Sequence, residues 1–180
     1  MYCRGPAQMS EAAGILPSNH FSCRPGRTRS DSLHYLIKFV KDAWRKEVVS
    51  ALFLDIKNAF LSITITQLIH NMGCRGVPAQ YTNWLRQKLE SRHTTLKFDG
   101  YVSEQIGLPI GINQGCLLLG IIFQFYNADL VDICKPGKGE EIIAFMDNTL
   151  ILVKGKTLAE TNAKFKRMMM REGGGGVVVV

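Results

Sequence analysis

An unusually apolar segment, residues 142–152, carries a carboxylate and an amide side by side at its centre, Asp147 and Asn148. Ile, Leu and Val suit a pleated strand, while Asp and Asn tolerate the backbone angles of a tight turn, so the segment predicts a strand, a turn and a second strand. A hairpin this apolar should be buried. A carboxylate at its tip would then cost desolvation free energy unless a positive charge lay against it, and a divalent cation is the obvious candidate. Asp147 is therefore a candidate metal ligand.

A second acid stands at the end of another apolar run. Residues 48–54 form a short, nearly continuous apolar stretch that ends at Asp55, which is typical of a buried strand with an acid at its carboxyl end. Asp55 and Asp147 can meet only if their strands are neighbours in one sheet. The pair would then bracket a metal, as nucleotidyl transfer by two Mg²⁺ ions requires. An Asp at a strand end is, however, more often a helix cap or a salt-bridge partner.

The chain is basic and has room for one domain. Its 180 residues are 46% hydrophobic and carry a net charge of +7, which favours a polyanionic partner such as nucleic acid, although a basic surface can also serve solubility alone. Residues 1–30 predict a basic, loop-rich segment containing Arg24 and Arg27. Residues 173–180, four Gly and four Val, form a low-complexity tail.

Periodicity and turn signals predict the remaining elements. Helices are expected from Asp31, over 67–72, from Pro78, over the largely buried stretch 117–134, and from Thr157, where Glu160 completes a capping box. Residues 94–106 predict a hairpin with a type I′ turn at its centre, 99–100.

The five cysteines are scattered, odd in number and without a C-x-x-C pair, as free thiols of a reducing compartment would be. We see no apolar signal segment at residues 1–6 and no run of eighteen apolar residues. We therefore expect an intracellular protein of the nucleus or cytoplasm, neither secreted nor inserted in a membrane.

Three short motifs together resemble those of one known family. Residues 54–60 (LDIKNAF), 111–116 (GINQGC) and 145–148 (FMDN) look like motifs A, B and C of reverse transcriptases, particularly those of non-LTR (LINE-type) retrotransposons. Their order and spacing also fit. Upstream, residues 20–28 (HFSCRPGRT) are similar to the segment that joins fingers to palm in these enzymes, so the resemblance covers about residues 15–174.

The resemblance implies an α+β fold with a small antiparallel palm sheet, helices packed on one of its faces, partial fingers and no thumb. It divides the chain into a fingers–palm junction (1–30), a palm-like domain (31–172) and the tail (173–180). The implied activity is RNA-directed DNA synthesis with Mg²⁺ or Mn²⁺, an RNA template, a DNA primer and dNTP. The oligomeric state stays open.

The resemblance also assigns roles to single residues. Asp55 and Asp147 would hold metal, and Phe60 would occupy the aromatic gate that excludes a ribose 2′-hydroxyl. Gln114 and Gly115 would shape the pocket for the templating base and the incoming nucleotide. Phe60 can equally be a core aromatic, and Gly115 can simply permit a tight turn.

Arg24 and Arg27 are candidate contacts to nucleic-acid phosphate, and their alternative is an ordinary solvated loop. Both lie in the segment that resembles the fingers–palm junction. Two arginines alone do not decide between these interpretations.

Three departures from the family pattern weaken the expected activity. Asn148 stands where motif C has a second aspartate, Leu61 where motif A closes with Asp, and residues 117–119 (LLL) where motif B continues Pro-Leu-Ser. An amide keeps a coordinating oxygen but removes one negative charge from the metal site. We predict a catalytically impaired fragment. The alternatives are a basic nucleic-acid-binding remnant without chemistry and a decayed reading-frame product without function.

Overall fold

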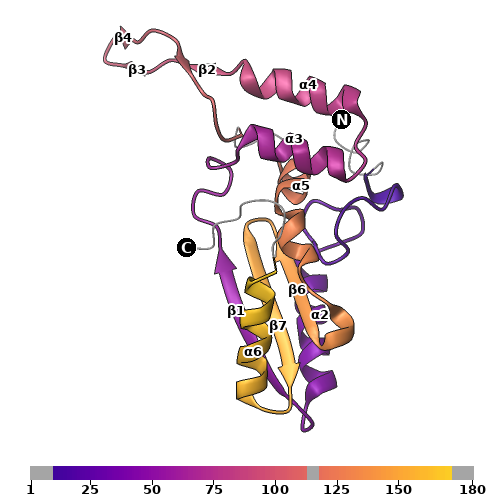
Figure 1. Ribbon diagram of the computed structural model, residues 1–180. Coiled ribbons are helices and arrows are strands. Elements are labelled where there is room, and N and C mark those ends of the chain that lie inside the picture. Colours follow the sequence, from indigo (N-terminus) through magenta and orange to yellow (C-terminus); the bar gives the residue numbers. More distant parts are fainter. Residues whose placement is uncertain (1–9, 113–117, 172–180) are drawn as a thin grey trace.

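A three-stranded antiparallel sheet forms the centre of the computed structural model, which describes residues 10–112 and 118–171. The strand order is β1 (Val48–Asp55), β7 (Asn148–Gly155), β6 (Glu140–Phe145), so the last strand in the chain lies in the middle (Figure 1). The N-terminal segment borders β6. The Phe21 N–H donates to the Ala144 carbonyl (2.9 Å), and the Ala144 N–H donates to the Asn19 carbonyl (2.9 Å).

Helices cover both faces of this sheet. On one face α6 (Leu158–Met169) packs through Phe165 and Met168 against Ile142 and Ile151. On the other face lies α2 (Arg29–Ala43) (Figure 1). Its side chains Tyr35, Leu36 and Phe39 meet Phe21, Ile143, Leu150 and Leu152. The α+β palm-like class is confirmed, but the expectation of helices on one face is wrong. Consecutive apolar residues are buried in both strands, 142–144 in β6 and 150–153 in β7, so both surfaces of these strands must be kept from water.

β1 is the sheet's edge strand. The prediction that it is a buried strand is wrong. Its burial alternates, with side chains such as Ala51 and Phe53 exposed and Leu52 and Leu54 partly covered; Phe53 is 74% exposed. Only β7 pairs with it in the described residues. The apolar run 48–54 therefore reflects one covered face and one exposed face.

Three further helices lie above the sheet in Figure 1. They are α3 (Ile65–Cys74), α4 (Ala79–Glu90) and α5 (Leu119–Asp132), and they share a core that includes Leu68, Leu85 and Phe123. After α4 the chain extends as an arm built from four short strands and then returns to α5 (Figure 1). These strands are β2 (His93–Thr94), β3 (Lys97–Phe98), β4 (Tyr101–Val102) and β5 (Ile106–Gly107). The β3–β4 turn has φ of 45° at Asp99 and 78° at Gly100, which confirms the predicted turn chemistry.

Local capping explains where the first and last helices begin. Thr28 and Asp31 form a reciprocal capping box, so α2 begins at Arg29, two residues before the predicted start. At α6 the Thr157 hydroxyl accepts the Glu160 N–H (3.2 Å) as predicted. The Glu160 carboxylate, however, accepts the N–H of Lys156 instead of that of the cap residue (2.8 Å).

A short 3-10 turn, η1 (Pro136–Lys138), joins α5 to β6. Among the described helices, none is both long and apolar enough to cross a bilayer.

Candidate active site

Asp55 and Asn148 lie directly opposite each other at one end of the sheet. The β1–β7 ladder pairs Asp55 with Asn148, at the end opposite to the pairing of Val48 with Gly155. Directly opposed side chains leave an antiparallel pair on the same face, with Cβ atoms about 4.5–5.5 Å apart. The strands that carry motifs A and C are therefore neighbours, as the sequence analysis required.

The turn between β6 and β7 consists of Met146 and Asp147. Phe145 and Asn148 pair across the ladder, so Asn148 is the first residue of β7. The prediction that Asn148 lies in the turn is therefore wrong. Met146 has a φ of 56°. This left-handed conformation costs a residue with a Cβ about 1–2 kcal/mol, so the turn holds backbone strain next to a candidate metal ligand.

The end of the sheet is open to solvent. Asp55 and Asn148 are exposed and Asp147 is half-buried, so the carboxylate at the hairpin tip is not fully buried as predicted. The Asn148 Nδ2 donates to Asp147 Oδ1 (3.2 Å). The amide thus occupies one oxygen of the neighbouring carboxylate.

The donor set suits a hard divalent cation but carries little charge. Two carboxylates and one amide oxygen are the ligand types that Mg²⁺ prefers. Within the described ranges, however, no group of three or more His, Cys, Asp and Glu side chains comes together. Asp55 and Asp147 would have to hold the cation with only one further neutral oxygen from Asn148.

The loop after β1 is tied to the beginning of motif B. The Ile112 N–H donates to the Phe60 carbonyl (2.8 Å), and the Gly111 N–H donates to the Ile63 carbonyl (2.8 Å). Gly111 has a φ of 78°, and a Cβ there would lie 2.7 Å from the Leu61 carbonyl oxygen. Only glycine fits this approach without a shift of the backbone.

Phe60 is half-buried and rests on the helical core. Its ring lies 5.2 Å from that of Phe123, centroid to centroid, with the planes tilted by 56°. Its contacts are those of a core aromatic, and its role as a gate stays a prediction. Gln114 and Gly115 lie outside the described residues.

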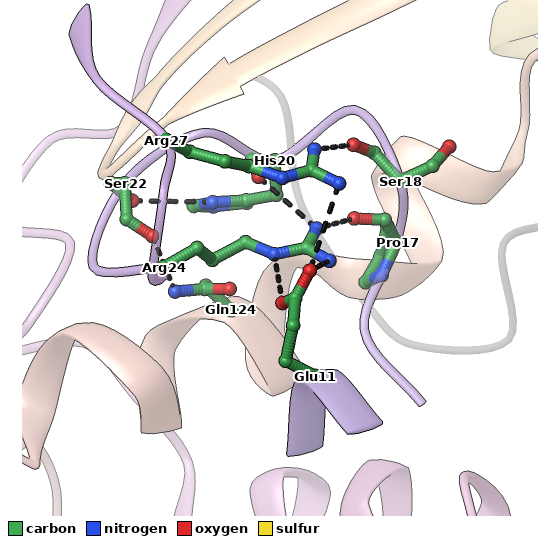
Figure 2. Close-up of polar contacts among 8 residues, drawn as sticks. All are labelled: Glu11, Pro17, Ser18, His20, Ser22, Arg24, Arg27 and Gln124. Carbon is green, nitrogen blue, oxygen red and sulfur yellow. Dashed lines mark hydrogen bonds and ion pairs between the residues drawn. The ribbon is translucent and has the colours of Figure 1, made fainter. Parts of the chain in front are cut away.

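Arg24 is a buried cation of the N-terminal loop and matches neither of its predicted roles. Its side chain is 5% exposed and binds Glu11 in bidentate fashion, through Nε (2.7 Å) and Nη2 (2.8 Å) (Figure 2). Its Nη1 donates to the Pro17 and His20 carbonyls. The hydrogen bond from Arg24 lowers the pKa of Glu11. Arg24 joins a carboxylate and two carbonyls of the loop, and its removal would leave these groups without their donor.

Arg27 is partly accessible. It donates to the Ser18 carbonyl and lies 3.8 Å from a Glu11 oxygen (Figure 2). Its guanidinium also stands over the Phe21 ring, 5.5 Å from the centroid. About a quarter of its side chain is exposed. Its contact with phosphate stays a prediction.

The same loop supplies buried polar residues that the sequence analysis did not single out. His20 and Ser22 are almost fully buried, and the Ser22 Oγ lies 3.2 Å from His20 Nδ1. The Gln124 Nε2 donates to the Ser22 carbonyl (2.7 Å), and the Met146 N–H donates to the Ser22 Oγ (3.0 Å). Residues 20–28 were noticed for their family resemblance, but no local pattern indicates a contact across more than 100 residues.

The arrangement is that of a polymerase palm: one acid ends the edge strand of a small antiparallel sheet, and the other lies in the turn that leads into the neighbouring strand. The family model of "Reverse transcriptase (RNA-dependent DNA polymerase)" matches residues 7–173. The chain therefore belongs to the reverse transcriptase family.

Two curated relatives from Drosophila melanogaster are transposon proteins. The chain is 28% identical over 156 residues to "Probable RNA-directed DNA polymerase from transposon X-element" and 29% identical over 117 residues to the corresponding protein of transposon BS. These alignments cover 81% and 64% of this chain. The chain spans only 16% and 13% of the length of these relatives.

Solved structures share the fold. A telomerase from Candida tropicalis, in complex with a fragment of telomeric RNA, superposes with a TM-score of 0.68 over 91% of this chain and 30% of its own. The apo form of that telomerase, truncated from its C-terminal domain, gives 0.65 over 93% of this chain and 37% of its own. Identities of 11% and 12% make this a likeness of fold.

Proposed function

We propose that this chain is the palm portion of a retrotransposon RNA-directed DNA polymerase in which Asp55 and Asp147 bind Mg²⁺ or Mn²⁺. The observation that supports this most directly is the β1–β7 ladder, which brings motif A and motif C to one end of the sheet. Such a cation, when bound, lowers the pKa of an attacking hydroxyl and neutralises phosphate charge. The protein's own part is to hold two carboxylates at a solvent-open edge where a primer end and a triphosphate have access.

Asn148 makes this site weak. A neutral amide replaces a carboxylate at the position opposite Asp55, and its Nδ2 also engages Asp147. Both effects lower the negative potential available to a divalent cation. We therefore infer that nucleotidyl transfer by this chain is impaired.

The partners of this site are an RNA template, a DNA primer and dNTP. Family membership supports the RNA template, and the net charge of +7 favours any polyanion. Arg29 is exposed and stands over the ring of Phe145, which immediately precedes the motif C turn (5.4 Å). Its charge is available to a phosphate near that turn. The scattered thiols agree with action inside the cell, in the nucleus or cytoplasm.

Two measurements on the purified chain test this proposal. Mn²⁺ binding should be measurable in the wild type, lost in Asp55→Ala and strengthened in Asn148→Asp. Primer extension on an RNA template should be close to background in the wild type and should rise in Asn148→Asp. A wild type whose Mn²⁺ binding is unchanged by Asp55→Ala would refute the metal site.

Binding without chemistry is the main alternative, and the same proteins distinguish it. A chain that binds an RNA–DNA duplex with a steep salt dependence, yet does not extend the primer even as Asn148→Asp, would be a nucleic-acid-binding remnant. A chain that does not unfold cooperatively would favour a decayed product without function.

A further inference from the structure

A single buried hydroxyl holds the turn that carries Asp147. The Met146 N–H donates to Ser22 Oγ (3.0 Å), and this oxygen lies 3.2 Å from His20 Nδ1. Ser22 and Met146 are 124 residues apart in the chain. The contact therefore links the N-terminal loop directly to motif C.

Met146 needs such a partner because of its place in the turn. It is the first of two turn residues and has a φ of 56°, so its N–H is not part of the β6–β7 ladder. A half-buried N–H without an acceptor is costly, and the left-handed conformation adds strain. The Ser22 hydroxyl accepts this N–H while Met146 is in its left-handed conformation.

Ser22 is itself held in place from several sides. Its carbonyl accepts the Gln124 Nε2 from α5 (2.7 Å), and the preceding Phe21 N–H donates to the Ala144 carbonyl of β6 (2.9 Å). Two residues further on, Arg24 anchors the loop through its bidentate contact with Glu11 (Figure 2). The hydroxyl that meets Met146 is thus fixed relative to the sheet.

His20 completes the arrangement as a neutral ring beside Ser22. Its ring is fully buried; burial, together with the nearby charges of Arg24 and Arg27, lowers its pKa to about 3. One ring nitrogen of a neutral imidazole donates and the other accepts, so His20 Nδ1 and Ser22 Oγ share one hydrogen bond in either direction. In both cases the Ser22 oxygen is held against the Met146 N–H.

We propose that Ser22, oriented by His20, is a positioning residue that sets the motif C turn so that Asp147 is presented beside Asp55. The proposal rests on the metal site put forward under Proposed function. It adds that the geometry of this site depends on the N-terminal loop as well as on the hairpin.

The variant Ser22→Ala removes the hydroxyl, and Ser32→Ala is its matched control. Ser32 is also buried, but its hydroxyl donates to the Arg29 carbonyl within α2 (2.7 Å) and not to a group of the turn. Loss of one hydrogen bond should raise the exchange rate of the Met146 amide about tenfold in Ser22→Ala. The Mn²⁺ dissociation constant should rise about threefold or more, which corresponds to a moderate loss of preorganisation. Ser32→Ala should change neither quantity, although urea unfolding should show similar destabilisation in both variants.

Unchanged exchange at Met146, or an equal Mn²⁺ affinity in the two serine variants, would overturn the proposal. If the wild type and Asp147→Ala bind Mn²⁺ equally, the metal site itself fails, and exchange at Met146 alone then decides whether Ser22 holds the turn. His20→Leu is a second variant in case Ser22→Ala does not fold. It removes the hydrogen-bond partner of Ser22 Oγ and should raise the exchange rate of the Met146 amide, whereas an unchanged rate would count against the proposal.

Discussion

Restoring the missing carboxylate of motif C, by Asn148→Asp, should strengthen divalent-cation binding about thirtyfold. A carboxylate about 4 Å from a divalent cation contributes about 2 kcal/mol in a medium as polar as water, which is about thirtyfold in affinity. The water limit applies because both Asp55 and Asn148 are exposed. A more buried site would give a larger factor.

The same substitution should destabilise the metal-free protein. The new carboxylate lies opposite Asp55 and next to Asp147, and it loses the hydrogen bond that Asn148 donates. Like charges about 5 Å apart repel by about 1 kcal/mol per pair in water, so the free energy of unfolding should fall by about 1–2 kcal/mol at low salt. Added salt should reduce this loss.

Titration with Mn²⁺, followed by calorimetry, measures the first effect, and urea unfolding with and without the cation measures the second. Asn83→Asp is the matched control. Asn83 is an exposed residue of α4, so this substitution adds the same charge away from the sheet. Equal Mn²⁺ affinities in Asn148→Asp and Asn83→Asp would refute the assignment of residue 148 to the metal site.

Three further outcomes follow from the structure and can be measured by urea unfolding. Gly111→Ala should cost about 2 kcal/mol or more, because its φ is 78° and the new Cβ would lie 2.7 Å from the Leu61 oxygen. Arg24→Leu should cost about 3 kcal/mol, because it leaves Glu11 and two carbonyls without their donor. Since the pKa of His20 falls from 6.5 to about 3 on folding, the unfolded chain binds the extra proton, and stability should decrease as the pH falls below 6.5, by up to about 1.4 kcal/mol per pH unit.

Each of these outcomes has a control within the chain. Gly137→Ala should be nearly neutral, because a Cβ there meets nothing within 4 Å. Arg27→Leu should cost less than Arg24→Leu, because Arg27 is more exposed and its ion pair is longer. His20→Gln should remove the acid-dependent loss between pH 6.5 and 4. An unaltered pH profile in that variant would show that other groups cause the loss.

Much of the local structure was predictable because short-range signals determine it. Positive φ at Asp99 and Gly100 follows from the preferences of Asp-Gly in a two-residue turn. The Thr157 cap follows from a side chain that satisfies an otherwise unpaired N–H three residues later. These interactions involve neighbours in the chain, so the residues alone specify them.

Part of the candidate site was also predictable. Asp55 and Asp147 each follow an apolar run, and they could meet only if their strands were neighbours, a condition that the β1–β7 ladder fulfils. Their roles as metal ligands stay a prediction. The turn itself was misplaced by one residue, because the sequence pattern favours Asp-Asn at the tip, whereas cross-strand pairing of Phe145 with Asn148 sets the register.

The sequence by itself determined the family, the order of the elements and the substitution at position 148. Tertiary structure alone decided that both faces of the sheet are covered, that β1 is an exposed edge and that Arg24 pairs with Glu11. It also brought Ser22 to the Met146 N–H. The physical reason is the same in each case: burial and hydrogen bonding between residues far apart in the chain depend on how whole elements pack, and no local pattern of residues encodes that packing.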